Sequence, residues 1–235
     1  MTIETITTKA FLFDMDGTLI DSTPAVLATW QVFAEKYDLD LTQVLKSSHG
    51  VRTADNLRRW CGIEDEDRLA EEAALFENMI VEEARRLQAV GEAGLVALPG
   101  VSPLLKQLPS HGWAVVTSAT GLYTSAALPL AGVPVPENLI TAEKVTNGKP
   151  HPEPYMLGAS ILSVEPKDCI VVEDAPSGIR AGVAAGSRVL AVCTSHTRQQ
   201  LEGHGATWTV EDLRDLRVTP SEGGFVCHLG ASRLS

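Results

Sequence analysis

Two aspartates separated by one residue, Asp14 and Asp16, follow the short apolar run Ala10–Phe13. An apolar run that ends in a glycine-containing loop, at Gly17 in this chain, is typical of a buried strand. Two carboxylates that face one site repel each other, so such a pair needs a bound cation or a shared proton. Mg²⁺ suits this position because it prefers oxygen ligands and is held by one or two carboxylates together with waters. The motif therefore predicts metal-assisted chemistry where this strand ends.

Hydroxyl groups and one lysine are candidate ligands for an anionic substrate further along the chain. Thr117 and Ser118 follow a second apolar run, and their hydroxyl and backbone N–H groups can hold phosphate oxygens without adding charge. Taken alone, such residues are more often turn or helix-cap residues. Lys149 lies in the proline-rich loop 147–152, where a lysine can neutralise a phosphate as a point charge. A single loop lysine, by contrast, is usually solvated.

A second acidic pair, Glu173 and Asp174, directly follows the apolar run Ile170–Val172. This pair can complete a magnesium site, which makes Asp14, Asp16, Glu173 and Asp174 the predicted metal ligands. Capping of the following helix by Asp174 is an alternative, and the two roles are compatible.

The composition is acidic, and this limits the classes of partner. The chain of 235 residues carries 30 Asp and Glu against 19 Lys and Arg, a formal charge of −11. Nucleic acid is not expected as a partner, because binding to its phosphate backbone needs clustered Lys and Arg. An acidic protein that handles phosphate must neutralise its own field locally, so we expect anion binding to depend on the metal.

No membrane span and no targeting segment is expected. No apolar run approaches the ~18 residues that a membrane span requires, and the first nine residues are too polar for a signal peptide. The four cysteines are widely spaced and form no C-x-x-C pair, so a zinc site is not expected. We expect reduced thiols in a cytoplasmic protein.

Strands and helices alternate over most of the chain and must position these residues. Short apolar runs, typical of buried strands, occur at 10–13, 113–116, 170–172, 189–192 and, more weakly, 208–210. Helical patterns lie at 101–108, 153–162 and 177–185. This alternation predicts an α/β fold with a doubly wound parallel sheet, in which functional residues lie just past the carboxyl ends of the strands.

Residues 22–94 interrupt the alternation because they contain no convincing strand. The segment 68–88 is strongly amphipathic, with apolar residues every three or four positions, and 25–35 and 54–60 are predicted as further helices. We predict an inserted helical cap domain at 22–94 and a core domain formed by 1–21 and 95–235. A long helical hairpin packed directly on the sheet is the alternative.

The four motifs, in the order acid pair, hydroxyl, lysine, acid pair, resemble those of the haloacid dehalogenase superfamily of phosphotransferases over nearly the whole chain. The resemblance implies that Asp14 is a nucleophile that forms an aspartyl-phosphate and that Asp16 is the general acid and base. It also implies catalytic roles for Thr117 and Lys149 and the use of Mg²⁺. The long interval from Asp14 to Thr117 and the short one from Thr117 to Lys149 resemble members with a helical, C1-type cap after the first motif.

Longer segments, such as 47–53 and 148–155, look like those of sugar phosphatases, including 2-deoxyglucose-6-phosphate phosphatase and glycerol-1(3)-phosphate phosphatase. The resemblance implies a Mg²⁺-dependent phosphomonoester hydrolase for a small sugar or polyol phosphate. The cap loop 49–52 is the expected specificity element. The expected substrate-binding residues are His49, Gly50, Arg52, Ser118, Asn147 and Lys149.

Other members of the superfamily are alternatives. Dehalogenases and phosphonatases lack the second aspartate of the first motif, so Asp16 argues against both. A beta-phosphoglucomutase-like phosphotransferase keeps the pair but carries a cap histidine that residues 24–28 lack. A non-catalytic ligand-binding relative is a further alternative, although its usual sign, the loss of a motif residue, is absent. A monomer or weak homo-oligomer is expected, and the tail beyond Val218 is predicted to form a hairpin-like edge or to stay partly disordered.

Overall fold

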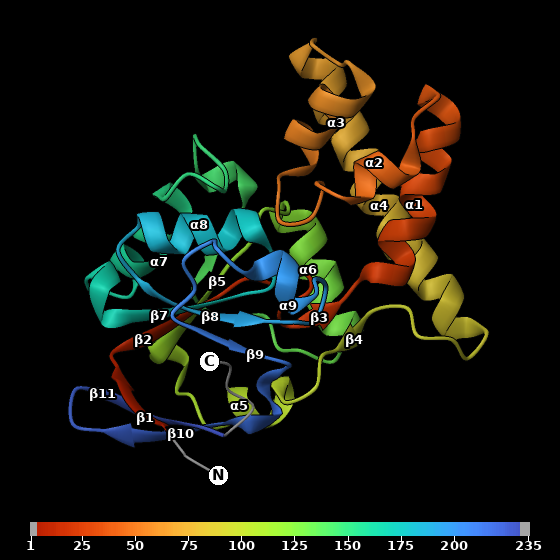
Figure 1. Cartoon of the computed structure of the whole chain (residues 1–235). Helices are drawn as coiled ribbons and strands as arrows, with labels where there is room; N and C mark the ends of the chain where they lie inside the picture. The colour runs from red at the N-terminus through yellow and green to blue at the C-terminus, as the bar shows by residue number, and fades with distance from the viewer. Residues whose placement is uncertain (1–3, 231–235) are drawn as a thin grey trace.

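The central element of the computed structural model, which describes residues 4–230, is a parallel sheet (Figure 1). Within that range the sheet has six strands in the spatial order β6-β5-β2-β7-β8-β9. In that order they are Leu139–Ile140, Trp113–Val116, Ala10–Phe13, Cys169–Glu173, Arg188–Val192 and Trp208–Val210. All neighbouring strands are parallel, so their carboxyl ends lie at one edge. The predicted doubly wound parallel fold is confirmed.

Helices cover both faces of this sheet, because successive strand residues point to opposite faces and both sets are apolar. The helices of this part of the chain are α5 (Val101–Leu105), α6 (Gly121–Leu130), α7 (Glu153–Ile161), α8 (Pro176–Ala184) and α9 (Arg198–Leu201). Phe11 and Phe13 belong to a core that includes α5 and α6, whereas Ala10 and Leu12 belong to a core that includes α7 and α8. Single 3₁₀ turns lie at Ser110–Gly112, Ala142–Lys144, Pro166–Asp168 and Leu213–Asp215.

Strand β6 and helix α6 are among the core elements that were not predicted from the sequence. Strand β6 has two residues, too few to form an apolar run. Helix α6 is apolar on more than one side, with Leu122 exposed and Leu128 buried, so it lacks the one-sided stripe on which the prediction of helices depends.

The segment predicted as a cap consists of helices that lie apart from the sheet (Figure 1). They are α1 (Thr23–Tyr37), α2 (Leu41–Leu45), α3 (Thr53–Cys61) and α4 (Glu66–Ala89). The Asp65 carboxylate caps α4 by accepting from the N–H of Arg68 at 2.8 Å. The ring of Trp30 in α1 packs edge to face on Phe76 in α4, with centroids 4.6 Å apart. No helix among residues 4–230 combines the length and apolar character needed to cross a membrane.

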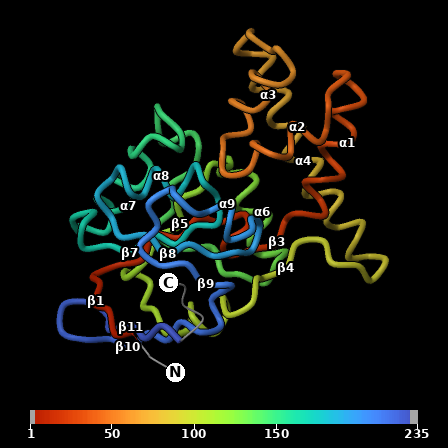
Figure 2. The backbone as a smooth tube through the Cα atoms, viewed as in Figure 1, coloured from red at the N-terminus to blue at the C-terminus, as the bar shows by residue number. Residues whose placement is uncertain are grey.

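The two connections between the helices and the core lie together (Figure 2). Strand β3 (Ile20–Asp21), through which the chain leaves the core, pairs antiparallel with β4 (Val96–Ala97), through which it returns. Strand β3 ends where the predicted cap begins, and β4 lies just after the predicted cap ends. The division into a core (1–21 and 95–235) and a cap (22–94) stays a proposal.

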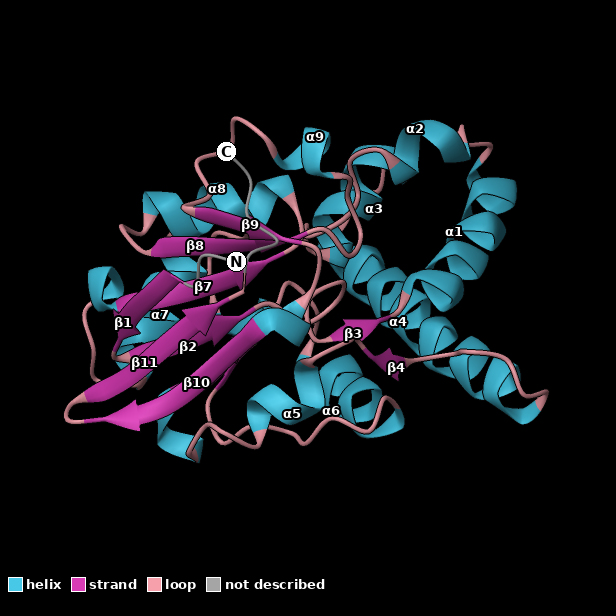
Figure 3. Ribbon diagram, turned by 60° about the horizontal axis from the view of Figure 1, so that its bottom comes forward, coloured by secondary structure: helices cyan, strands magenta, loops and turns pink. Residues whose placement is uncertain are grey.

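The tail folds back onto the first strand in a second sheet (Figure 3). Its strands β1 (Glu4–Thr8), β10 (Leu216–Ser221) and β11 (Gly224–Leu229) are antiparallel in the order β1-β11-β10. Phe225 packs on Phe11 of the main sheet with centroids 5.9 Å apart. Of the two alternatives for the tail, the structure therefore has the hairpin, and residues 231–235 lie outside the described part.

Candidate active site

The ends of β2 and β7 bring the two acidic motifs together. Phe13 and Val172 are opposite each other in these neighbouring parallel strands, so the residues that follow them meet at one edge. The Asp14 N–H donates to the Val172 carbonyl at 3.0 Å. Asp14, Glu173 and Asp174 are buried, and one carboxylate oxygen from each lies within 4.8 Å of the others. The sheet therefore gathers three carboxyl groups at a single point.

Lys149 reaches this cluster from the loop before α7. Its Nζ lies 2.5 Å from Asp14 Oδ1 and 2.8 Å from Glu173 Oε1, and its side chain is fully buried. Burial alone would lower the pKa of Lys149, but the two carboxylates outweigh burial and hold this pKa above its ordinary value. The lysine is therefore a permanent cation next to Asp14.

Both oxygens of Glu173 are already engaged. Oε1 accepts from Lys149 and from the Tyr155 hydroxyl at 2.8 Å, while Oε2 accepts from the N–H groups of Asp174 and Ala175 at 3.0 and 3.1 Å. A Cβ at Gly178 would lie 1.6 Å from Oε1, so only glycine fits there. Glu173 thus orients Lys149, and Asp14 and Asp174 are the carboxylates better placed to hold a metal.

Asp174 is the second carboxylate with capacity for a cation. It accepts from Thr18 Oγ1 at 3.0 Å and from the Ser195 hydroxyl. The backbone at Gly17 has φ +83°, and a Cβ there would lie 2.2 Å from Asp174 Oδ2, so this close approach requires glycine. Burial raises the pKa of Asp14 to about 7 and that of Asp174 well above its ordinary value. The buried carboxylates of this cluster outnumber its lysine, Lys149. This excess suits a divalent cation, which takes oxygen ligands.

Asp16 does not join this cluster. Its Oδ1 accepts from the Tyr123 hydroxyl at 2.9 Å, and the Ser22 hydroxyl also bonds to its carboxylate. Burial raises the pKa of Asp16, and these two hydrogen bonds oppose the rise. Among residues 4–230, the carboxylates grouped around one cation position do not include Asp16. Its side chain therefore gives no support to the predicted metal-binding role, whereas a raised pKa suits a proton donor.

The two hydroxyl residues after β5 have different environments. Thr117 Oγ1 accepts from the Ala119 N–H at 3.0 Å, which orients the side chain and leaves its O–H able to donate. Ser118 Oγ donates to the Gly50 carbonyl of the cap loop at 3.0 Å. Ser118 therefore contacts the cap, and its predicted contact with substrate stays a prediction.

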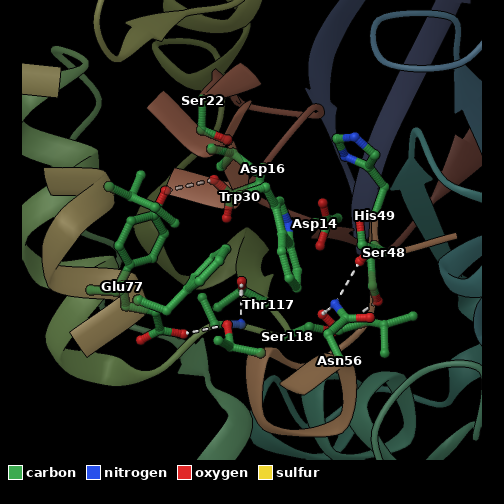
Figure 4. A pocket seen from close by; sticks show the side chains of 18 residues that line it. Asp14, Asp16, Ser22, Trp30, Ser48, His49, Asn56, Glu77, Thr117 and Ser118 are labelled. Carbon is green, nitrogen blue, oxygen red and sulfur yellow. Dashed lines mark hydrogen bonds between the residues drawn. The ribbon is translucent and has the colours of Figure 1, made fainter. Parts of the chain in front are cut away.

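A cavity lies between the strand ends and the helices (Figure 4). Residues outside 22–94 contribute Asp14, Asp16, Thr117, Ser118, Ala119 and Tyr123, and residues 22–94 contribute Ser22, Val26, Trp30, Ser48, His49, Gly50, Val51, Thr53, Asn56, Phe76, Glu77 and Ile80. The cavity has a volume of about 90 Å³. One water needs roughly 10–15 Å³, so the space suits several waters or a small organic group.

The cap loop rests on the core next to this cavity. Ser177 Oγ donates to the His49 carbonyl at 3.3 Å. The backbone at Gly50 has φ +72°, and a Cβ there would lie 2.6 Å from Ser177 Oγ, so the loop can approach this closely only with glycine. The His49 ring meets His196 edge to face at 5.6 Å, and burial lowers the pKa of His49. The structure therefore brings His49 and Gly50 to the cavity as neutral groups.

Arg52 lies elsewhere, in a larger cleft beside the cap loop. Its Nε is 2.7 Å from Asp55 Oδ2, and its Nη1 donates to the Thr146 carbonyl at 3.1 Å. Arg52 thus joins α3 to the loop that carries Lys149, and the structure does not bring it to the cavity with Asp14. Its predicted contact with substrate stays a prediction.

Asn147 lines the same cleft and is also engaged within the core. Its N–H and its Nδ2 both donate to Glu153 Oε2 at 2.9 Å. These bonds hold the loop onto the start of α7, so Asn147 shapes the loop and does not reach the cavity. Its substrate-binding role stays a prediction.

The geometry predicts that Arg52→Ala lowers kcat/KM equally on different substrates. We expect kcat/KM to fall by about tenfold on both glycerol 3-phosphate and p-nitrophenyl phosphate, because the loss removes charge-assisted bonds that seat the cap. Initial rates on the two esters check this. Arg58→Ala is the matched control, since the ion-pair partners of Arg58, Asp55 and Glu66, both lie within residues 22–94. A loss confined to glycerol 3-phosphate would instead indicate direct contact with substrate.

Comparison with known proteins decides the family. The profile of the haloacid dehalogenase-like hydrolases matches residues 8–186, which include the whole carboxylate and lysine cluster. Hexitol phosphatase A of Escherichia coli (strain K12) is 41% identical, with 93% of this chain and 97% of the relative covered. The chain belongs to the haloacid dehalogenase-like hydrolases. The membership predicted from the four motifs is thus confirmed.

A second curated relative and a solved structure are also similar to this haloacid dehalogenase-like hydrolase. Glycerol-1-phosphate phosphohydrolase 2 of Saccharomyces cerevisiae (strain ATCC 204508 / S288c) is 35% identical over 89% of this chain and 84% of its own. The crystal structure of a hydrolase from Pseudomonas syringae superposes with a TM-score of 0.74, at 24% identity, over 88% of this chain and 94% of that chain. The structural match shows the shared fold.

Several residues of the hydrolase's site were not predicted from the sequence. Ser195 follows β8, so the rule that polar residues after buried strands form the site could have found it. Tyr123, Tyr155 and Glu77 lie on helices, where a polar group facing the site has no local signal. Their contacts depend on how those helices pack.

Proposed function

We propose that this hydrolase cleaves phosphate monoesters of a small sugar or polyol, with Mg²⁺ held by Asp14 and Asp174. The observation that carries the proposal is the cavity in which Asp14, Asp16 and Thr117 face a wall of mixed polar and apolar cap side chains. The phosphatase class is confirmed by the family and by relatives named as phosphatases. Their hexitol and glycerol phosphate names support a small hydroxylated substrate.

Asp14 is the proposed nucleophile. In the first half-reaction an oxygen of Asp14 bonds to phosphorus, the ester P–O bond breaks, and Asp16 gives its proton to the departing oxygen. Lys149, 2.5 Å from Asp14 Oδ1, compensates negative charge at the reacting group, and the Thr117 hydroxyl donates to a phosphoryl oxygen. The product of this half-reaction is an aspartyl-phosphate.

Asp16 serves as a base in the second half-reaction. Water attacks phosphorus, Asp16 takes a proton from that water, and the bond between phosphorus and Asp14 breaks to release inorganic phosphate. The Tyr123 hydroxyl, which donates to Asp16 Oδ1, keeps this carboxyl directed at one position throughout. When bound, the divalent cation supplies further charge neutralisation for the phosphoryl group.

The pKa shifts predict a pH-dependent stabilisation by Mg²⁺. The raised pKa of Asp14, about 7, means that the metal-free folded chain holds more protons than the unfolded chain between about pH 4 and 7, and the raised pKa of Asp174 acts in the same direction. The stability that Asp14 contributes is present at low pH and is lost as the pH rises through about 7. We therefore expect Mg²⁺ to stabilise by about 2.7 kcal/mol at a hundredfold excess over Kd at pH 8, and by much less at pH 5.

Urea unfolding at both pH values, with and without MgCl₂, measures this difference. NaCl at matched ionic strength is the control for general screening. An equal effect of Mg²⁺ at pH 5 and pH 8 would contradict the assignment of these carboxylates to the metal site.

A panel of phosphate monoesters tests the proposed function. We expect phosphate release from glycerol 3-phosphate, fructose 1-phosphate, hexitol 6-phosphates or 2-deoxyglucose 6-phosphate, with EDTA removing the activity and Mg²⁺ restoring it. Activity that is indifferent to chelation would rule out the metal assignment, and failure to hydrolyse any member of the panel would overturn the substrate class.

The mutase alternative has a simple discriminator. Beta-glucose 1-phosphate with its bisphosphate activator should be hydrolysed or left intact by this chain, and isomerisation would favour the phosphotransferase reading instead. A cytoplasmic location and a monomeric or weakly associating state stay predictions.

A further inference from the structure

The wall of the cavity opposite Asp14 contains two residues that the proposed mechanism does not use, Trp30 from α1 and Glu77 from α4 (Figure 4). Both are almost fully buried, with 2% and 4% of their surface exposed. Both carry hydrogen-bonding groups, which are costly to bury unless a partner is available. Their presence at a substrate cavity therefore needs an explanation beyond packing.

Trp30 presents a donor without a protein partner. Among residues 4–230, its indole N–H makes no hydrogen bond with another protein atom. It is nevertheless not one of the fully buried side-chain atoms that lack a partner in this range, which are Tyr37 Oη, Trp60 Nε1 and Arg198 Nη1. Trp30 lines the cavity, so a ligand bound there can supply the missing partner. The ring itself is held edge to face against Phe76 at 4.6 Å and against Phe33 at 6.4 Å. The direction of the N–H is thus set before any substrate binds.

Glu77 presents an acceptor with remaining capacity. It accepts from the Thr53 hydroxyl at 3.0 Å, from the Thr120 N–H at 3.3 Å and from the Thr120 hydroxyl. A carboxylate has about four acceptor positions, so at least one is left. Burial raises the pKa of Glu77, and the charge of Asp16 raises it further. These partners are neutral, so a substrate hydroxyl would improve the solvation of this carboxylate.

We propose that Trp30 and Glu77 are the specificity-determining residues for the leaving group, an inference that rests on the proposed phosphatase function. The Trp30 N–H donates to one hydroxyl oxygen of the substrate, and the Glu77 carboxylate accepts a hydrogen bond from a hydroxyl. The faces of Trp30 and Phe76, with Val26 and Ile80, contact the carbon chain. The cavity thereby selects a flexible, hydroxylated alkyl group over a purely apolar one.

The expected selectivity for hydroxylated esters has a physical basis. A site built to hydrogen-bond a substrate hydroxyl rejects an analogue without it, because the buried donor and acceptor are then left unpaired. The phosphoryl group is bound by the core residues and is the same in every ester. Recognition of the remainder must therefore come from groups that face it across the cavity.

The test compares esters that differ only in hydroxyl groups. For the unaltered chain, Trp30→Phe and Glu77→Gln, kcat/KM is measured on glycerol 3-phosphate against propyl phosphate and on sorbitol 6-phosphate against hexyl phosphate. We expect the unaltered chain to prefer the hydroxylated ester of at least one pair. Each variant should reduce that preference by about tenfold or more, because Trp30→Phe removes the donor and Glu77→Gln replaces one charged acceptor oxygen by an NH₂ donor.

Matched controls use the same substitutions outside the cavity. Trp60→Phe lies on α3, and Glu83→Gln lies on α4, where Glu83 pairs with Arg86 at the surface. Both should leave the preference unchanged. Urea unfolding of every variant shows whether the cap remains folded.

The outcomes separate the two proposals. Hydrolysis by the unaltered chain, with a preference that Trp30→Phe and Glu77→Gln leave intact, overturns the inference alone. An equal fall in kcat/KM on both members of a pair indicates a purely structural role and also overturns it. If the unaltered chain releases phosphate from neither pair nor from the wider panel, the proposed function fails first and the inference fails with it.

Discussion

Replacing Asp14 by Asn is expected to reduce kcat by on the order of 10⁴-fold or more, because no other carboxylate is placed to form the covalent intermediate. Asn has the same shape and can still accept from Lys149, but its amide is a poor nucleophile. The neighbouring Glu173 cannot substitute, since both of its oxygens are engaged by Lys149, Tyr155 and backbone N–H groups. Phosphate release from p-nitrophenyl phosphate and from glycerol 3-phosphate, in the presence of MgCl₂, measures the loss.

The fold should survive this change. Asn removes one of several crowded negative charges, so we expect the free energy of unfolding to be maintained or increased at neutral pH without metal. Asp65→Asn is the matched control, because Asn caps a helix about as well as Asp and this position is remote from the site. A kcat for Asp14→Asn within tenfold of that of the unaltered chain would contradict the proposed mechanism.

Replacing Lys149 by Met is expected to damage activity and stability together. The change keeps an unbranched side chain, one atom shorter, but removes the cation that lies 2.5 Å from Asp14 and 2.8 Å from Glu173. We expect kcat to fall by roughly 10²–10³-fold, as when one charge-stabilising group is removed from an active site. Removing one member of a buried ion pair typically costs about 3–5 kcal/mol in the free energy of unfolding.

The loss of stability caused by Lys149→Met should depend on pH in one direction. Lys149 lowers the pKa of Asp14, which burial raises to about 7, so removal of the lysine raises that pKa further. Protonation then relieves the repulsion, and the stability loss should be smaller at pH 5 than at pH 8. Lys106→Met, an exposed lysine far from the site, is the control. A loss of stability that is greatest at pH 5 would contradict the ion-pair account.

The central sheet and the cluster at its edge could be read from the sequence because both depend on local signals. Apolar runs predict the strands, and in a parallel sheet the residues after neighbouring strands meet at one edge. That rule suffices to bring Asp14 close to Glu173 and Asp174, whose strands are adjacent. The long amphipathic helix α4 was predicted for the same reason, since its apolar stripe is a property of the segment itself.

Only the tertiary structure could decide which polar groups face the cavity. Arg52 and Asn147 have the chemistry of substrate ligands, yet Asp55, Thr146 and Glu153 engage them away from it. Trp30 and Glu77 look like ordinary helix residues in the sequence, and they reach the cavity because of how α1 and α4 pack on each other and face the strand ends. The reason is physical: the positions of the strands along the chain are encoded in short-range patterns, whereas contacts between cap and core depend on packing between segments distant in the chain.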